Sequence, residues 1–224
     1  MDSPDTALAT TVLGEAFGCS PATAEALAER SRMRSHPAHS VIIAGETTGT
    51  HVHVMVDGHA RMAAVAVDGR LVVIEDYLRG DFLGEAALFE RRPAGHPVSA
   101  VVASQSAAFA HDTFLDLMDR HSAVALAVSR RLIARLARVS GRMVEVATLS
   151  ATGRIHAELL RQARASADLA IRPAPVLAQL ALSVQSTRET VSRTISALEK
   201  RGIITRNDHE LRVVAPHRLE ELIY

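Results

Sequence analysis

The segment 187–193, TRETVSR, carries polar side chains of the types and spacing that contact DNA. An arginine can donate two hydrogen bonds to guanine O6 and N7, and a carboxylate can accept one from cytosine N4. Arg188, Arg193 and Glu189 supply these groups, and the hydroxyls between them suit phosphate oxygens, which position a protein without specifying a sequence. The predicted DNA-contacting residues are Thr187, Arg188, Glu189, Thr190, Ser192 and Arg193.

The same segment has the periodicity of a helix that packs by one face. Its apolar residues recur at spacings of four and three, and the charged residues lie opposite. A first helix, beginning near Leu177, should end at a turn close to Gln185, and Gly202 is suited to end the second helix. This pattern predicts a helix-turn-helix whose second helix enters a major groove. The alternative is that Ser186 and Glu189 form a capping box and that the charges are simply solvated.

Several elements must position this helix. A hairpin is expected to follow, with strands 203–206 and 211–214 joined by a turn at Asn207-Asp208. Upstream, a long helix should run from near residue 112 to about 149, with a break around 119–122. Its apolar residues alternate at spacings of four and three, which indicates a coiled-coil seam between two parallel copies rather than a helix lying on its own domain. The seam consists of Leu132, Leu136, Val139, Met143 and Val146.

The N-terminal half is expected to contain mostly strands. Short β-like runs between residues 41 and 111 are separated by turns, and Asp57-Gly58 and Asp68-Gly69 are hairpin signals because glycine readily takes a positive φ. Such spacing predicts a small β-roll or barrel. Before it, residues 11–30 indicate short helices, with Ser20 as N-cap and Pro21 at the first helical position of the second.

Composition limits the function further. The 224 residues favour two domains, and the zero net charge hides an acidic front half and a basic back half. Residues 1–129 have 9 Lys and Arg against 16 Asp and Glu, whereas residues 130–224 have 16 against 9. One cysteine, Cys19, excludes an internal disulfide and a multi-cysteine metal site. No signal peptide, membrane span or catalytic motif is recognised, so we expect a cytoplasmic protein that is not an enzyme and does not act at a membrane.

Two motifs in order, GDFLGEAALF at 80–89 and RETVSR at 188–193, resemble the catabolite-activator/fumarate-nitrate regulator (CRP/FNR) superfamily of transcription regulators. The hairpin glycines, the long helix and the hinge 152–155 fall in the family's order, so the resemblance covers roughly residues 15–220. It implies an α+β fold: a cyclic-nucleotide-binding-like β-roll (jelly roll) over 1–118, a central dimerisation helix over 119–150 and a winged helix-turn-helix over 151–224. It also implies a homodimer on a palindromic operator with a TGTGA-like half-site, with RNA polymerase as a candidate partner.

Carried over by residue, the family's base readers match Arg188, Glu189 and Arg193, and its N-cap matches Thr187. We therefore favour Thr187 over Ser186 as the cap. One departure is Gln185, which stands at a turn where many members have glycine, and a positive φ there is costly for a side chain.

The resemblance also implies an effector pocket, formed by Gly84, Glu85, Val98, Ser99, Arg135 and Ser140. In the family's cAMP binders an arginine before the hydroxyl residue holds the cyclic phosphate, but this chain has Val98 there, and Val139 replaces a hydroxyl. Because no Lys or Arg lies between Arg92 and Arg120, cAMP in its usual pose is not expected unless Arg91, Arg92 or His96 substitutes.

No cofactor is assigned. Iron–sulfur chemistry is excluded by the single cysteine, whereas another nucleotide or haem stays open, because histidines such as His51 and His53 share one strand face without identifying an axial ligand. The competing function is a cyclic-nucleotide-type signalling module whose C-terminal helices mediate protein contacts instead of DNA binding.

Overall fold

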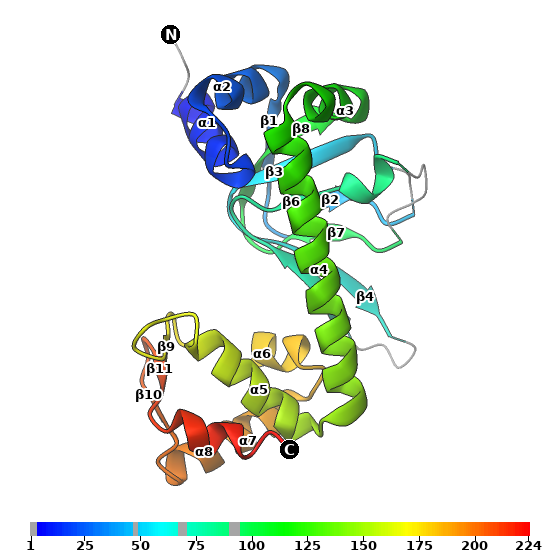
Figure 1. Ribbon diagram of the computed structural model, residues 1–224. Helices are drawn as coiled ribbons and strands as arrows, with labels where there is room; N and C mark the ends of the chain where they lie inside the picture. The colour runs from blue at the N-terminus through cyan, green and yellow to red at the C-terminus, as the bar shows by residue number, and fades with distance from the viewer. Residues whose placement is uncertain (1–3, 47–48, 67–70, 90–94) are drawn as a thin grey trace. The chain divides into compact units, whose positions relative to one another are not determined.

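The computed structural model describes residues 4–46, 49–66, 71–89 and 95–224 (Figure 1). The chain forms two compact units, Met1–Arg135 and Leu136–Tyr224, and the division falls inside one long helix. The sequence-based division at residues 118 and 150 concerns function rather than compactness, so it stays a prediction.

The first unit contains short helices, a set of short strands, and the start of the long helix. Its helices are α1 (Pro4–Phe17), α2 (Pro21–Arg30), the short 3₁₀ helix η1 (Glu85–Ala87), α3 (His111–Arg120) and α4 (Ser122–Thr148), which continues into the second unit. Its strands are β1 (Arg32–His36), β2 (Val41–Ile43), β3 (His51–Asp57), β4 (Ala60–Val65), β5 (Leu71–Tyr77), β6 (Phe82–Leu83), β7 (Val98–Ala100) and β8 (Ser104–Ala110).

These strands form two antiparallel four-stranded sheets, ordered β1-β8-β3-β6 and β2-β7-β4-β5. Alternation along each strand sends successive side chains to opposite faces. One face of β3 and β8 therefore packs against the helices, in a core that includes Val52, Phe109 and Phe114. A smaller apolar cluster, which includes Met55, Tyr77 and Val98, draws on strands of both sheets. The β-roll expectation is confirmed.

The hairpin prediction at Asp57-Gly58 is wrong, although Gly58 does have a positive φ of 91°. Strands β3 and β4 belong to different sheets, so this turn carries the chain from one sheet to the other. The turn at Asp68-Gly69 lies outside the described residues, but the strands on either side of it, β4 and β5, do pair antiparallel. At the N-terminus α1 begins at Pro4, earlier than expected, while Ser20 caps α2 by accepting from the Thr23 amide as predicted.

The second unit is a helical domain with a small sheet. Its own elements are α5 (Ala151–Ala163), β9 (Ala170–Ile171), α6 (Leu177–Ser183), α7 (Arg188–Lys200), β10 (Ile204–Arg206), β11 (Leu211–Val213) and α8 (Pro216–Glu220). Strands β10 and β11 pair antiparallel as the expected hairpin, and β9 adds a third strand beside β11. One core joins these elements through residues such as Ile155, Leu180, Ile195 and Leu211. This is a winged helix-turn-helix.

The long helix α4 matches the expected break and length, since α3 ends at Arg120 and α4 runs to Thr148. Its first turns are held in the first unit by Val124, Ala127 and Val128, which are buried. The five seam residues are exposed in the single chain, Leu136 at 67% and Met143 at 75%. Among the described residues, no helix combines the length and apolar character needed to cross a membrane.

Candidate nucleic-acid interface and effector pocket

Helix α7 begins at a cap that its own sequence supplies. The Thr187 hydroxyl accepts a hydrogen bond from the Thr190 amide at 3.2 Å, so Thr187 and not Ser186 is the N-cap. At the other end Gly202 has a φ of 65°, and the Ile203 amide donates to the Leu198 carbonyl, which is the αL ending that glycine permits. Both ends of α7 are therefore fixed by local chemistry.

The two faces of α7 differ as predicted. Val191, Ile195 and Leu198 are buried in the domain core, whereas Arg188, Glu189, Ser192 and Arg193 are exposed and Thr190 is half-buried. The pKa of Glu189 lies below its usual value because the carboxylate accepts from its own backbone amide and from the Thr187 hydroxyl, with Arg188 and Arg193 nearby. The carboxylate is thus ionised at neutral pH and can accept hydrogen bonds.

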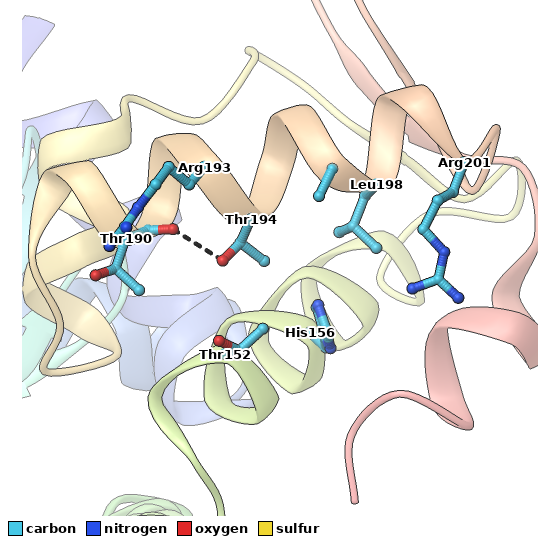
Figure 2. A pocket seen from close by; sticks show the side chains of 8 residues that line it. Thr152, His156, Thr190, Arg193, Thr194, Leu198 and Arg201 are labelled. Atoms are coloured by element: carbon cyan, nitrogen blue, oxygen red, sulfur yellow. Dashed lines mark hydrogen bonds between the residues drawn. The ribbon is translucent and has the colours of Figure 1, made fainter.

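A groove runs between α5 and α7 with a volume of about 360 Å³. Figure 2 shows Thr190 and Arg193 at one end and Arg201 at the other, with Thr152 and His156 facing them from α5. Hydroxyls and guanidinium groups at one groove are suited to phosphate oxygens. His156 is buried, its Nδ1 lies 2.9 Å from the Leu222 carbonyl oxygen, and burial lowers its pKa, so the imidazole is neutral at pH 7.

The turn before α7 contains Gln185, the residue that departs from the glycine common at this turn. Gln185 has a φ of 52°, a left-handed conformation that glycine adopts more easily. Arg154 holds this turn: its Nε donates to the Val184 carbonyl at 2.9 Å and its Nη2 to the Gln185 carbonyl at 3.2 Å. Its Nη1 donates to the Leu149 carbonyl at 3.0 Å. One side chain therefore ties the end of α6 to the residue after α4.

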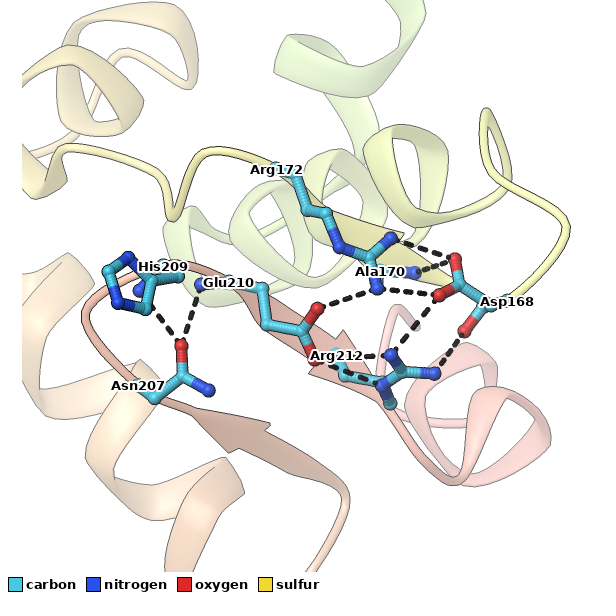
Figure 3. A network of polar contacts seen from close by, with 7 residues as sticks. All are labelled: Asp168, Ala170, Arg172, Asn207, His209, Glu210 and Arg212. Carbon is cyan, nitrogen blue, oxygen red and sulfur yellow. Dashed lines mark hydrogen bonds and ion pairs between the residues drawn. The ribbon is translucent and has the colours of Figure 1, made fainter.

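The wing is held by a second polar network (Figure 3). The Asn207 side chain accepts from the His209 and Glu210 amides at 2.8 Å, which closes the turn between β10 and β11. Arg172 lies 2.6 Å from both Asp168 and Glu210, and Arg212 lies 3.1 Å from the same two carboxylates. The hydrogen bond from Arg172 lowers the pKa of Asp168 to about 2. These pairs join the wing to the β9 segment.

In the first unit, two predicted pocket residues, Glu85 and Arg135, contact each other, and a third, Gly84, lies directly before Glu85. Gly84 has a φ of 91°, and a Cβ there would lie 2.5 Å from the His51 carbonyl oxygen, so glycine is required. Glu85, 5% exposed, accepts from Arg135 Nη1 at 2.7 Å. Arg135 Nε also lies 2.6 Å from Glu75, a residue that the sequence reasoning had not selected.

The remaining predicted pocket residues lie on β7 and farther along α4. Val98 is fully buried in the apolar cluster and pairs with Met62, so its side chain faces inward. Ser99, paired with Arg61, alternates to the other face of β7. Ser140 is exposed on the part of α4 that belongs to the second unit. Arg91 and Arg92 lie outside the described residues, and His96 is exposed.

These residues do not fit a cyclic phosphate. Val98 offers no charge, and the guanidinium of Arg135 already contacts two carboxylates. His36 and His53 also have a protein partner, because the Ser106 hydroxyl lies 2.8 Å from His36 Nε2 and 3.0 Å from His53 Nδ1. Burial lowers the pKa of His53 to about 4.

Known proteins share both units. Residues 33–121 match the description of a cyclic nucleotide-binding domain, and residues 153–222 match that of a Crp-like helix-turn-helix domain. The cAMP-activated global transcriptional regulator CRP of Pasteurella multocida is 27% identical over 192 residues, covering 82% of this chain and 90% of that protein. The cAMP-activated global transcriptional regulator Vfr of Pseudomonas aeruginosa is 25% identical over 193 residues, covering 80% and 86%.

A solved structure, that of a CooA mutant from Carboxydothermus hydrogenoformans, has a TM-score of 0.80 at 16% identity and covers 95% of both chains, which shows a shared fold. A β-roll of the cyclic-nucleotide-binding type, continued by a long helix into a winged helix-turn-helix, defines a class of DNA-binding transcription regulators. The chain belongs to the CRP/FNR superfamily of these regulators.

Proposed function

We propose that the protein works as a homodimer that binds a palindromic operator and is controlled by an effector at its N-terminal domain. The observation that carries the DNA-binding part is the division of α7 into two faces. Arg188, Glu189 and Arg193 project from its capped N-terminal half, while Val191 and Ile195 fix the opposite face in the core. A helix with this division can present its polar face to a major groove.

The dimer follows from the exposed seam on α4. Its five residues, exposed by between 40% and 75%, would bury their apolar surface against a second copy. Two recognition helices related by a two-fold axis would then read half-sites about one helical turn, ~34 Å, apart. In this scheme residues 1–118 sense the effector, 119–150 dimerise and 151–224 bind DNA. RNA polymerase is the candidate further partner, and the cytoplasm is the expected compartment.

The proposed half-site is TGTGA-like. Arg188 and Arg193 would each hold a guanine through O6 and N7, and Glu189 would accept from the cytosine paired with one of them. Thr190 and Thr187, together with Ser192, would contact phosphates. Thr152 and Arg201 line the same groove as Arg193 and extend the surface available to the backbone.

An unbiased selection from random duplexes tests this function. The full chain should enrich a palindrome, and Arg193→Ala should cost roughly 1–3 kcal/mol per half-site and relax discrimination at a single base pair. Arg206→Ala, in the wing, is the control: it should weaken binding to all sequences evenly and lower the salt slope by about one unit. If Arg193→Ala enriches the same motif with equal strength at every position, the base-reader assignment fails. If no palindrome is enriched and binding is insensitive to salt, the protein-contact module becomes the better account.

A further inference from the structure

A buried carboxylate lies on the inward face of β5. Along β5 the inward-facing residues are Val73, Glu75 and Tyr77, and all three are buried. Glu75 is only 6% exposed. Burying a carboxylate is costly unless it is paired and hydrogen-bonded, so its partners identify what it does.

One of its partners, Arg135, belongs to the predicted effector pocket. Glu75 Oε2 lies 2.6 Å from Arg135 Nε and accepts a hydrogen bond from the Tyr77 hydroxyl at 3.4 Å. Arg135 reaches Glu85 with its Nη1 at 2.7 Å, so one guanidinium joins two buried carboxylates. Glu85 Oε2 is buried and has no hydrogen-bond partner among the described residues. Glu75, Glu85 and Arg135 together form a pocket triad.

The triad decides which charges the pocket tolerates. A bound phosphate needs a charge-assisted donor to replace its lost hydration. Arg135 is the guanidinium nearest to Glu85 in the described part of the pocket, and Glu75 competes for it from within the protein. A phosphate entering here would displace a buried carboxylate and then face its negative charge in a medium where charge–charge repulsion is stronger than in water.

We propose that Glu75 is the specificity-determining residue of the effector pocket: by engaging Arg135 it excludes anionic effectors, cyclic phosphates included. The pocket then selects a neutral or cationic effector that donates a hydrogen bond to the unpartnered Glu85 Oε2. This inference rests on the proposed sensing function of the N-terminal domain, but it does not depend on which DNA sequence α7 reads.

Calorimetric titration of the full chain with cAMP as the probe tests the role of Glu75. Four proteins are compared: wild type, Val98→Arg, Glu75→Gln, and the double variant. Val98→Arg supplies a guanidinium, and Glu75→Gln removes the competing charge while keeping the side-chain size. The control is Glu15→Gln in the Val98→Arg background, because Glu15 is a surface carboxylate that pairs with an arginine, Arg79, in the same unit.

Wild type should show no binding at millimolar cAMP. The double variant should bind at least tenfold more tightly than Val98→Arg alone, and the Glu15→Gln control should match Val98→Arg. Glu75→Gln alone should bring cAMP binding into the measurable range. This variant places no charge in the apolar cluster, so it tests the role of Glu75 even if the double variant does not fold. Tight cAMP binding by wild type, or no gain from Glu75→Gln in either background, would overturn the proposal. DNA selection by wild type is measured separately, so its failure would count against the proposed function and leave the role of Glu75 standing.

Discussion

Replacing Arg154 with methionine should loosen the turn that orients the recognition helix. Methionine keeps an unbranched apolar stem but removes all the donors of the guanidinium. The three carbonyl oxygens of Leu149, Val184 and Gln185 would then depend on water. Because Gln185 adopts an unfavourable positive φ, the loss of these three bonds should let the turn relax.

The size of the effect follows from the number and charge of the bonds. A hydrogen bond from a charged donor contributes about 1.5–3 kcal/mol net, and Arg154 makes three, at 2.9, 3.0 and 3.2 Å. The side chain is half-buried, so water can replace part of this contribution. A loss of roughly 2–4 kcal/mol is expected, which for a unit of fewer than about 100 residues lowers Tm by on the order of 15 °C.

Calorimetry of the full chain measures the transition of the C-terminal unit, and amide hydrogen exchange at residues 184–187 locates the effect. Arg164→Met, at the C-cap of the same helix, is the matched control, since Arg164 makes an exposed pair with Glu220 that should contribute about 0–1 kcal/mol. Arg154→Met should also weaken DNA binding, because α7 is then held less firmly at its start. If Arg154→Met shifts Tm no more than Arg164→Met and exchange at the turn is unchanged, the assignment of Arg154 as the residue that holds the turn is wrong.

Two further predictions concern the seam and the wing. Val139→Glu should convert the dimer to a monomer in sedimentation experiments because two carboxylates would meet in an apolar seam, whereas Ala134→Glu, on the far side of α4, should leave it dimeric; equal behaviour of the two would contradict the seam. Because its interactions hold the folded-state pKa of Asp168 at about 2, below its ordinary value of 3.8, Asp168 stabilises the fold above that ordinary value and loses this contribution as pH falls toward 2. The Tm difference between wild type and Asp168→Asn should therefore shrink between about pH 4 and pH 2, and a difference constant with pH would show that the network with Arg172 does not stabilise the wing.

The recognition helix could be predicted because its determinants are local. A cap at Thr187, an ending at Gly202 and apolar residues repeating at helical spacing all lie within one short stretch. Such signals need no information about distant segments. The positive φ of Gln185 was also foreseeable, because the resemblance indicated glycine at that turn.

The features of the fold and of the pocket that could not be predicted depended on pairings between residues far apart in the sequence. The strand β1, with the sequence RMRSH, is too polar to be recognised as a strand, and its place is set by pairing with β8 about 70 residues later. The Asp57-Gly58 signal specified a turn but not the sheet that β4 would join. The sequence contained one local indication of the role of Glu75, because a charged residue there falls at the period-two spacing of the buried residues of β5. Its contact with Arg135, 60 positions later, could be seen only in the structure.

The helix α4 is the element through which an effector could act on DNA binding. Arg131 and Arg135, one helical turn apart, both reach the first unit: Arg131 pairs with Asp81 and lies 5.6 Å from the Phe82 ring, and Arg135 contacts Glu75 and Glu85. The seam begins at the next residue after Arg131 on the same continuous helix. An effector that donates a hydrogen bond to Glu85 Oε2 would weaken the pull of Glu85 on Arg135, and so would change the forces on the helix that the proposed dimer shares. Linkage requires this coupling to be reciprocal, so an effector that raises operator affinity must bind more tightly, by the same factor, to the DNA-bound protein.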